Sequence, residues 1–229
     1  VALAVLPVLH RHLSPRGWAL LLVPLLAAPH AALAIGLAFV LAPSGWIARL
    51  VSPWPSGWEI PPDIATVNDP YGVAMIIGLM VKEVPFLLLV FLSALGRIPL
   101  QSTLRTGRSL GYSTQVVWQR LVLPQIYPMV RLPVYVVLSF SLSVVDVALI
   151  LGPGTPPPLA VVMTRWFQSA DTGMLLPASA AAVLQTLIVA AAIVMWRLCE
   201  ATMSQVRSRA LWHHRPIPDW PARLLTVLL

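Results

Sequence analysis

Three charged side chains lie well inside long apolar runs of the sequence. Lys82 and Glu83 are adjacent in the run from Tyr71 to Leu95, and Asp146 lies in the run from Leu132 to Leu151. Charge in an apolar run of membrane length is costly, so such residues serve ion or solute passage or are buried in pairs. The chemistry they offer is therefore the binding of protons, cations or polar solutes within a membrane.

Lys82 and Glu83 need partners from elsewhere, because neighbouring residues of one helix do not face each other. A structural ion pair between Lys82 and Asp146 is one interpretation. In the other, Glu83 and Asp146 help to shape a path for a cationic or hydrogen-bonding solute. The sequence leaves both interpretations open.

A polar stripe is predicted in the same region. Ser139, Ser143 and Asp146 are spaced i, i+4 and i+7, which places them along one face of a helix. We expect this face to lie inside a bundle, because lipid offers no hydrogen-bonding partners. The small serine side chains would let neighbouring helices approach closely. Gln185 and Thr186, in the last apolar run, are expected to hydrogen-bond between helices.

The elements that must position these residues are predicted to be membrane helices. The chain has 229 residues, 58% of them hydrophobic and only 10% charged, and its mean hydropathy is +0.83. Soluble domains carry about 25% charged residues, so this composition excludes an ordinary soluble protein. A membrane helix needs about 20 apolar residues, and four runs qualify: Trp18–Leu41, Tyr71–Leu95, Leu132–Leu151 and Leu175–Leu198.

Shorter apolar runs lie at both ends of the sequence, at Val1–Leu9 and Leu224–Leu229. The first is followed by basic residues, which is the reverse of the order in a signal peptide. We interpret both runs as partial spans and the chain as a fragment of a longer one. The predicted fold is all-α, a polytopic membrane helical bundle with four complete and two partial spans that form a single transmembrane domain over residues 1–229.

The distribution of basic residues predicts the orientation of the spans. Of the 15 Lys and Arg residues, Arg49 and Arg165 lie on one predicted side and Lys82 lies inside a span. All the others lie on the opposite side: Arg11, Arg16, Arg97, Arg105, Arg108, Arg120, Arg131, Arg197, Arg207, Arg209, Arg215 and Arg223. The positive-inside rule places this larger set in the cytoplasm. Topology therefore accounts for the net charge of +7, and no nucleic-acid partner is needed.

The cytoplasmic connection between the second and third predicted spans, residues 97–131, has a helix-turn-helix pattern. Leu100–Leu110 is predicted as a short helix that ends at Gly111, a residue able to adopt the left-handed conformation. Ser113 is a natural N-cap for a second helix, Thr114–Leu123. We expect Pro124 to stop that helix before the chain re-enters the membrane.

This loop resembles the EAA loop of the permeases of ABC importers. The family motif reads Glu-Ala-Ala, three residues, Gly, nine residues, Ile, one residue, Leu-Pro. Gly111 occupies the glycine position, Leu121 the isoleucine position, and Leu123 and Pro124 the final pair. The chain departs from the motif at its start, where Arg105, Thr106 and Gly107 replace Glu-Ala-Ala. The acidic residue of the motif, and any ion pair it makes, is therefore absent.

The resemblance implies the membrane subunit of a binding-protein-dependent importer in a bacterial inner membrane, which moves a small solute inward. It implies six core helices per half, two halves that are fused or separate, and an external solute-binding protein. Cytoplasmic ATPase subunits would dock on the 100–128 loop and hold ATP and Mg²⁺. Arg105 and Arg108 share a helix face that could meet acidic groups on the ATPase or, alternatively, lipid head groups.

Two further segments, Asp69–Phe86 and Leu151–Trp166, are similar to fused two-half permeases of the group that includes thiamine and iron permeases. The chain lacks the Gly-x₄-Gly-Lys-Ser/Thr motif of a phosphate-binding loop. Its sequence also shows no metal cluster or nucleophilic triad, so we expect no catalytic residue, metal or cofactor on this chain. The alternatives are a secondary transporter driven by an ion gradient and a structural subunit of a membrane complex.

Overall fold

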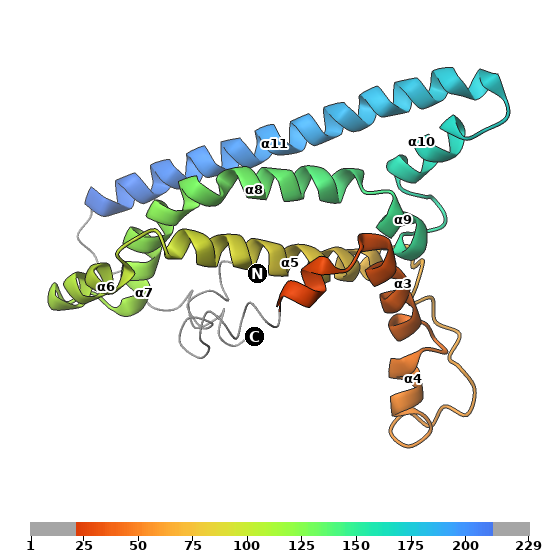
Figure 1. Ribbon diagram of the computed structural model, residues 1–229, viewed down its shortest axis with the longest axis horizontal. Helices are drawn as coiled ribbons and strands as arrows, with labels where there is room; N and C mark the ends of the chain where they lie inside the picture. Colours follow the sequence, from red (N-terminus) through yellow and green to blue (C-terminus); the bar gives the residue numbers. More distant parts are fainter. Residues whose placement is uncertain (1–21, 213–229) are drawn as a thin grey trace.

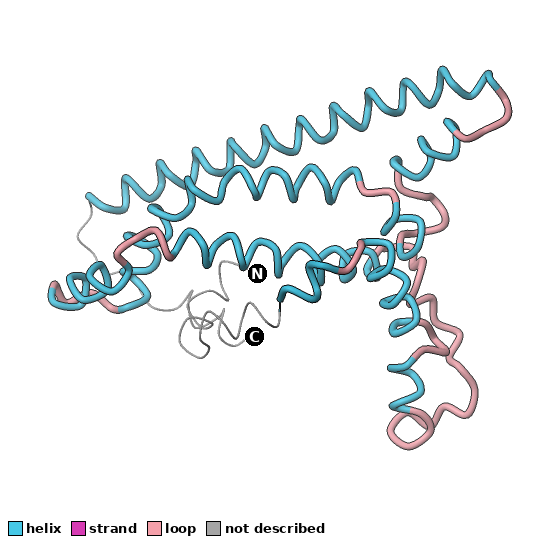
Figure 2. Tube along the Cα trace, viewed as in Figure 1, coloured by secondary structure: helices cyan, strands magenta, loops and turns pink. Residues whose placement is uncertain are grey.

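The computed structural model describes residues 22–212, and within that range the regular elements are helices (Figure 2). Four segments are long and apolar enough to cross a membrane: His30–Val51, Val73–Leu95, Thr114–Ser143 and Thr172–Thr202. The prediction of an all-α chain with four membrane-length spans is therefore confirmed. The partial spans predicted at Val1–Leu9 and Leu224–Leu229 lie outside the described residues.

Three long helices form a layer in the order α5, α8, α11, with α8 in the middle (Figure 1). The short helices α6 and α7 lie at one end of this layer and α9 and α10 at the other, where α3 and α4 leave it crosswise. The bounds are α3 His30–Leu41, α4 Trp46–Val51, α5 Val73–Leu95, α6 Leu100–Ser109, α7 Thr114–Val117, α8 Leu123–Ser143, α9 Asp146–Leu151, α10 Leu159–Phe167 and α11 Leu175–Trp212.

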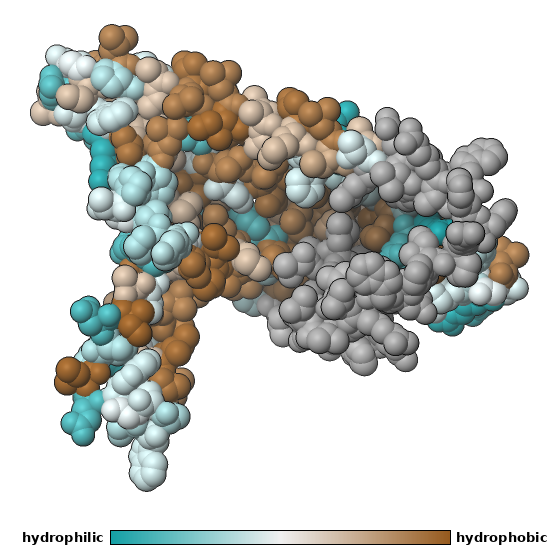
Figure 3. All heavy atoms as spheres, turned by 180° about the vertical axis from the view of Figure 1, so that it is seen from behind, coloured by the Kyte–Doolittle hydropathy of each residue, from teal (hydrophilic) through white to brown (hydrophobic). Residues whose placement is uncertain are grey.

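Two buried clusters hold the helices together. At the α6–α7 end, Val122, Ile126 and Val130 recur every four residues and pack against α5 around Phe91. At the opposite end, small and aliphatic side chains join α3, α5 and α9. Elsewhere the long helices expose many large apolar side chains, and Figure 3 shows hydrophobic residues across the middle of the molecule. Such a surface suits lipid or another membrane subunit.

The third span differs from its predicted bounds of Leu132–Leu151. The helix starts at Thr114, passes through a π-helical segment, Trp118–Val122, and continues as α8 to Ser143. The prediction that Pro124 stops this helix is therefore wrong. Pro124 lies inside the continuous helix, two residues after the end of the π-helical segment. The apolar pattern alone could not show that the helix starts in the polar loop.

The first span also differs from its prediction. A helix over residues 22–27 is broken at residues 28–29, and α3 begins at His30 with Pro29 as its N-cap residue. Residues 18–21 of the predicted span lie outside the described part of the chain. The second span agrees closely with Tyr71–Leu95, and the fourth is longer than predicted because α11 continues to Trp212.

Candidate functional site

A helical elbow, defined here as residues 100–117, connects α5 to the long helix that contains α8. Gly111 turns the chain with a φ of +82°, a conformation that glycine adopts freely and other residues rarely adopt. The hydroxyl of Ser113 accepts a hydrogen bond from the amide of Val116 at 3.4 Å and caps α7. The sequence thus forms two short helices around a left-handed glycine.

Gly107 joins the two helices of the elbow. A Cβ atom at this position would lie 2.3 Å from Cγ2 and 3.2 Å from Cβ of Val117, so a side chain fits only if Val117 moves. Gly107 stands where the family motif has its second alanine. The sequence departs from the motif at a point where α6 and α7 are in direct contact, and this contact makes the elbow one packed unit.

The outer surface of the elbow carries basic and apolar side chains. Arg105, Arg108, Leu110 and Tyr112 are exposed, and Arg108 Nε donates a hydrogen bond to Thr114 Oγ1 at 3.2 Å. An open groove of about 710 Å³ runs beside α6 and includes Arg105 in its wall. Of the motif's last residues, Leu121 is exposed in the π-helical segment, and Leu123 and Pro124 are partly buried at the start of α8.

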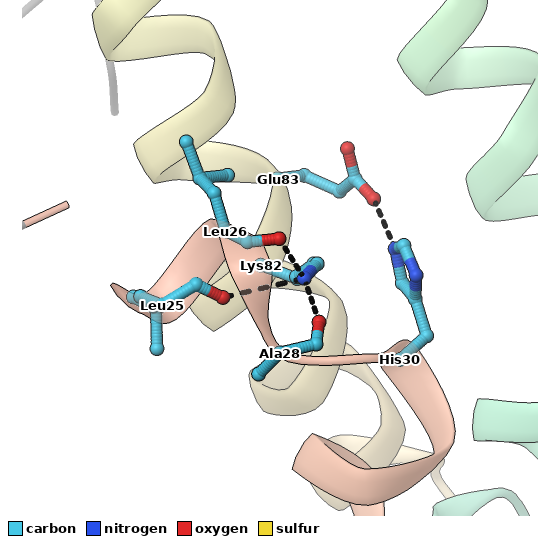
Figure 4. Close-up of polar contacts among 6 residues, drawn as sticks. All are labelled: Leu25, Leu26, Ala28, His30, Lys82 and Glu83. Atoms are coloured by element: carbon cyan, nitrogen blue, oxygen red, sulfur yellow. Dashed lines mark hydrogen bonds and ion pairs between the residues drawn. The ribbon is translucent and has the colours of Figure 1, made fainter. Parts of the chain in front are cut away.

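Lys82 stabilises the break in the first apolar segment (Figure 4). Its ammonium donates hydrogen bonds to the carbonyl oxygens of Leu25 at 3.2 Å, Leu26 at 2.8 Å and Ala28. An ammonium has three donors, and the last carbonyls of a helix lack partners within the helix. The side chain is only 6% exposed. Lys82 is therefore satisfied by backbone carbonyls, and the structure does not pair it with Asp146.

Glu83 faces the other side of the same break (Figure 4). Its Oε1 lies 3.5 Å from Nε2 of His30, the first residue of α3. The His30 ring also packs against Phe140 of α8, with the ring centroids 4.7 Å apart. Two adjacent residues of α5 thus contact the two sides of the break, and Glu83 lies where α3, α5 and α8 meet.

Asp146 is exposed at the start of α9, after the helix is interrupted at residues 144–145. This break interrupts the helix that was predicted to place Ser139, Ser143 and Asp146 on one face. The hydroxyls of Ser139 and Ser143 donate to carbonyls four residues earlier in α8, each at 2.8 Å. The serines are therefore satisfied within their own helix, and Asp146 belongs to a separate element.

Gln185 and Thr186 behave differently from each other. Gln185 Nε2 donates to the carbonyl oxygen of Leu142 at 2.8 Å, next to the end of α8, so the predicted interhelical bond is present. Thr186 Oγ1 donates to the carbonyl of Ala182 in its own helix, so the same prediction is wrong for Thr186. Like Lys82, Gln185 donates a hydrogen bond to a backbone carbonyl near the end of a helix, where the helix itself supplies no amide donor.

Asp69 caps the start of α5. Its carboxylate accepts hydrogen bonds from the amides of Val73 at 2.8 Å and Ala74 at 3.0 Å. These bonds favour the ionised form, so they hold the pKa of Asp69 below its ordinary value of 3.8. The cap therefore stabilises the fold when the carboxylate is charged.

We predict that Asp69→Asn lowers the unfolding temperature at neutral pH. A carboxyl group with a lowered folded pKa stabilises the protein above its unfolded pKa, and this contribution is lost as the pH falls through the folded pKa. The difference between the two proteins should therefore close below the ordinary pKa of 3.8. Thermal unfolding in detergent across this range measures it, with Asp63→Asn, at an exposed position of the same loop, as control. A difference that stays constant with pH would contradict the prediction.

Sequence reasoning missed a polar cluster that joins α8 to α11. Glu200 Oε1 accepts a hydrogen bond from the Tyr127 hydroxyl, and the Tyr135 hydroxyl lies 3.0 and 2.9 Å from the two oxygens of Glu200. Trp196 Nε1 donates to the Tyr127 hydroxyl at 2.9 Å, and Arg197 approaches that of Tyr135 at 3.5 Å. The available signal was the placement of Trp196, Arg197 and Glu200 on one helix, near the basic end of the last predicted span.

The described residues contain no group of three or more His, Cys, Asp or Glu side chains that could hold a metal ion. The polar side chains described above instead form hydrogen bonds at helix ends and lie on the exposed surface of the elbow. Four membrane-length helices with this elbow define the chain as a polytopic α-helical integral membrane protein. That class agrees with the predicted location.

Comparison with known proteins narrows the class. No family model matches the chain. The chain is 32% identical over 186 residues to the inner membrane ABC transporter permease protein YnjC of Escherichia coli (strain K12). The match covers 80% of this chain and 34% of that protein, so the chain spans about a third of the relative's length. The chain is thus related to an inner-membrane ABC transporter permease, which confirms the resemblance to ABC transporter permeases and the inner-membrane location predicted from the sequence.

Proposed function

We propose that this chain is part of the membrane subunit of an ATP-driven importer that moves a small solute inward. A separate ATPase would dock on the 100–128 loop and supply ATP and Mg²⁺. The observation that carries this proposal is the elbow, a packed helix-turn-helix with the EAA-like spacing from Gly111 to Pro124. The relation to an ABC transporter permease supports it.

The elbow is built to transmit movement. Gly107 and Val117 interlock α6 with α7, and α7 continues without a break into α8. The buried face that includes Val122 and Ile126 then packs against α5. A force applied to the elbow by a closing ATPase dimer would therefore move α5 and α8 together. Exposed Arg105 and Arg108 would bind acidic groups on the ATPase. This contact would replace the one made by the acidic residue of the motif, which this chain lacks.

The other partners in the proposal are a second permease half, fused or separate, an external solute-binding protein and membrane lipid. We assign Glu83 and Asp146 to the solute path, which suits a cationic or hydrogen-bonding solute such as those of the thiamine and iron group. The carbonyl partners of Lys82 favour a structural role for that residue. Glu83→Gln with Asp146→Asn should reduce uptake, and intact uptake in the double variant would remove these two residues from the path.

The ion-gradient alternative is less well supported. In discontinuous membrane helices, carbonyls freed by the break can coordinate a transported cation. Here the ammonium of Lys82 already donates hydrogen bonds to the three carbonyl oxygens at the break in residues 28–29. A purely structural subunit would be favoured if uptake survived deletion of the protein.

We predict that a P-loop ATPase copurifies with the wild-type protein in mild detergent and is lost with Gly111→Val. A β-branched residue is strongly disfavoured at a φ of +82°, so the elbow should distort while the spans remain. Gly154→Val is the matched control, since a Cβ there meets open space and its φ is not positive. Absence of an ATPase from folded wild type, or equal recovery with both variants, would contradict the docking role.

A further inference from the structure

The polar cluster of Tyr127, Tyr135, Trp196, Arg197 and Glu200, called here the tyrosine–glutamate link, lies just beyond the π-helical segment of the third span. Tyr127 comes five residues after Val122, where that segment ends. A π-helical segment departs from regular α-helical hydrogen bonding and often occurs at functional positions. The link therefore starts where the helix leaves the elbow and enters the bundle.

The link attaches α11 to α8 at the end of the layer near the elbow, which is called the inner end below. Both tyrosines come from α8 and the other three side chains come from α11. Bonds from hydroxyls to a carboxylate are charge-assisted and stronger than bonds between neutral groups. At the other end of the layer, Gln185 bonds to the carbonyl of Leu142. The two helices are thus tied at two levels along their length.

In the part of the chain that the structure describes, α5 is not a main packing partner of α11. Figure 1 shows α11 on the far side of α8 from α5, and within the described residues α11 packs mainly on α8 and α10. Movement that starts at the elbow reaches α8 directly, because the two form one continuous helix. Among the described side-chain bonds between α8 and α11, the link lies nearer to the elbow than the bond of Gln185 does.

We propose that Tyr127, Tyr135 and Glu200 are positioning residues that make the inner half of α11 follow α8 when the elbow moves. This proposal rests on the proposed function, because the movement is supplied by the docked ATPase. It assigns α8 and α11 to one rigid unit during ATP binding. Without the hydroxyl–carboxylate bonds, α11 would remain held near Gln185 but be free to separate from α8 at its inner end.

The test measures the α8–α11 distance in the intact complex with its ATPase. Spin labels are placed at Leu132→Cys and Met195→Cys, both at exposed positions, after Cys199→Ser removes the native cysteine. We expect a distance distribution that ATP with vanadate leaves unchanged in wild type. In Tyr127→Phe/Tyr135→Phe, the same treatment should shift or broaden it. Tyr71→Phe, at an exposed position outside the bundle, should behave as wild type.

Two results would overturn the proposal: a distribution in the double variant that nucleotide leaves unchanged, or a wild-type distribution that nucleotide shifts. ATPase copurification and ATP hydrolysis are measured on the same samples. A complex that contains an active ATPase but gives either of these results contradicts the link alone. A folded wild-type protein that carries no ATPase contradicts the proposed function itself.

Discussion

Lys82→Met protein is expected to unfold at a markedly lower temperature than wild type in mild detergent. Methionine has a similar length but no donor, so three carbonyl groups at the break in residues 28–29 lose their partner. A buried polar group left without a hydrogen bond costs about 1–3 kcal/mol. The expected loss is therefore several kcal/mol, which is large against the about 5–15 kcal/mol stability of a typical protein.

The control for this variant is Ile76→Met on the same helix, where the side chain is exposed and the change should be within about 0.5 kcal/mol. Thermal unfolding is measured for both variants alongside solute uptake. If Lys82→Met unfolds like wild type and uptake stops, Lys82 lines the solute path and its role at the helix break is secondary. That outcome would reverse the assignment made from its carbonyl partners.

Gly107→Ala is expected to release the ATPase from the complex, because the added Cβ would lie 2.3 Å from Cγ2 of Val117. Overpacking a close contact costs about 1–3 kcal/mol, and here the cost falls on the junction of α6 and α7. Recovery of the ATPase by affinity purification measures the effect. Val117→Ala in the same protein should restore part of the recovery, since it removes the clashing methyl groups.

Gly36→Ala is the matched control for this substitution. Gly36 also lies in a helix, but a Cβ there meets no atom within 4 Å. Alanine favours helix over glycine by about 1 kcal/mol, so this variant should be as stable as wild type or slightly more stable. Equal ATPase recovery from Gly107→Ala and Gly36→Ala would show that the elbow tolerates separation of its helices and would contradict the account of Gly107.

The span pattern could be predicted from sequence because bilayer thickness sets the length of an apolar run. The second and fourth runs were located within a few residues at their starts, Val73 and Leu175. The turn of the elbow could also be predicted from the sequence, because a left-handed glycine and a serine N-cap are local signals at Gly111 and Ser113. These features depend on residues close together in the chain.

The helix breaks and their partners could not be predicted in the same way. Lys82 bonds to backbone carbonyls more than fifty residues away, and any residue type presents the same carbonyl. The π-helical segment allowed Pro124 to lie inside a continuous helix, against its usual effect. The break at residues 144–145 likewise separated Asp146 from the serine stripe. Tertiary contacts decided each of these points.

The central claim, that the elbow docks an ATPase, is tested most directly by cross-linking. Leu110→Cys in a Cys199→Ser background places one reactive thiol on the exposed turn of the elbow, and Trp54→Cys places one on the exposed loop after α4. After treatment with a thiol-to-amine cross-linker in native membranes, the partners are identified by mass spectrometry. The account predicts a P-loop ATPase attached at residue 110 and absent at residue 54. A folded protein that yields no ATPase at residue 110, or the same yield at both positions, would contradict it.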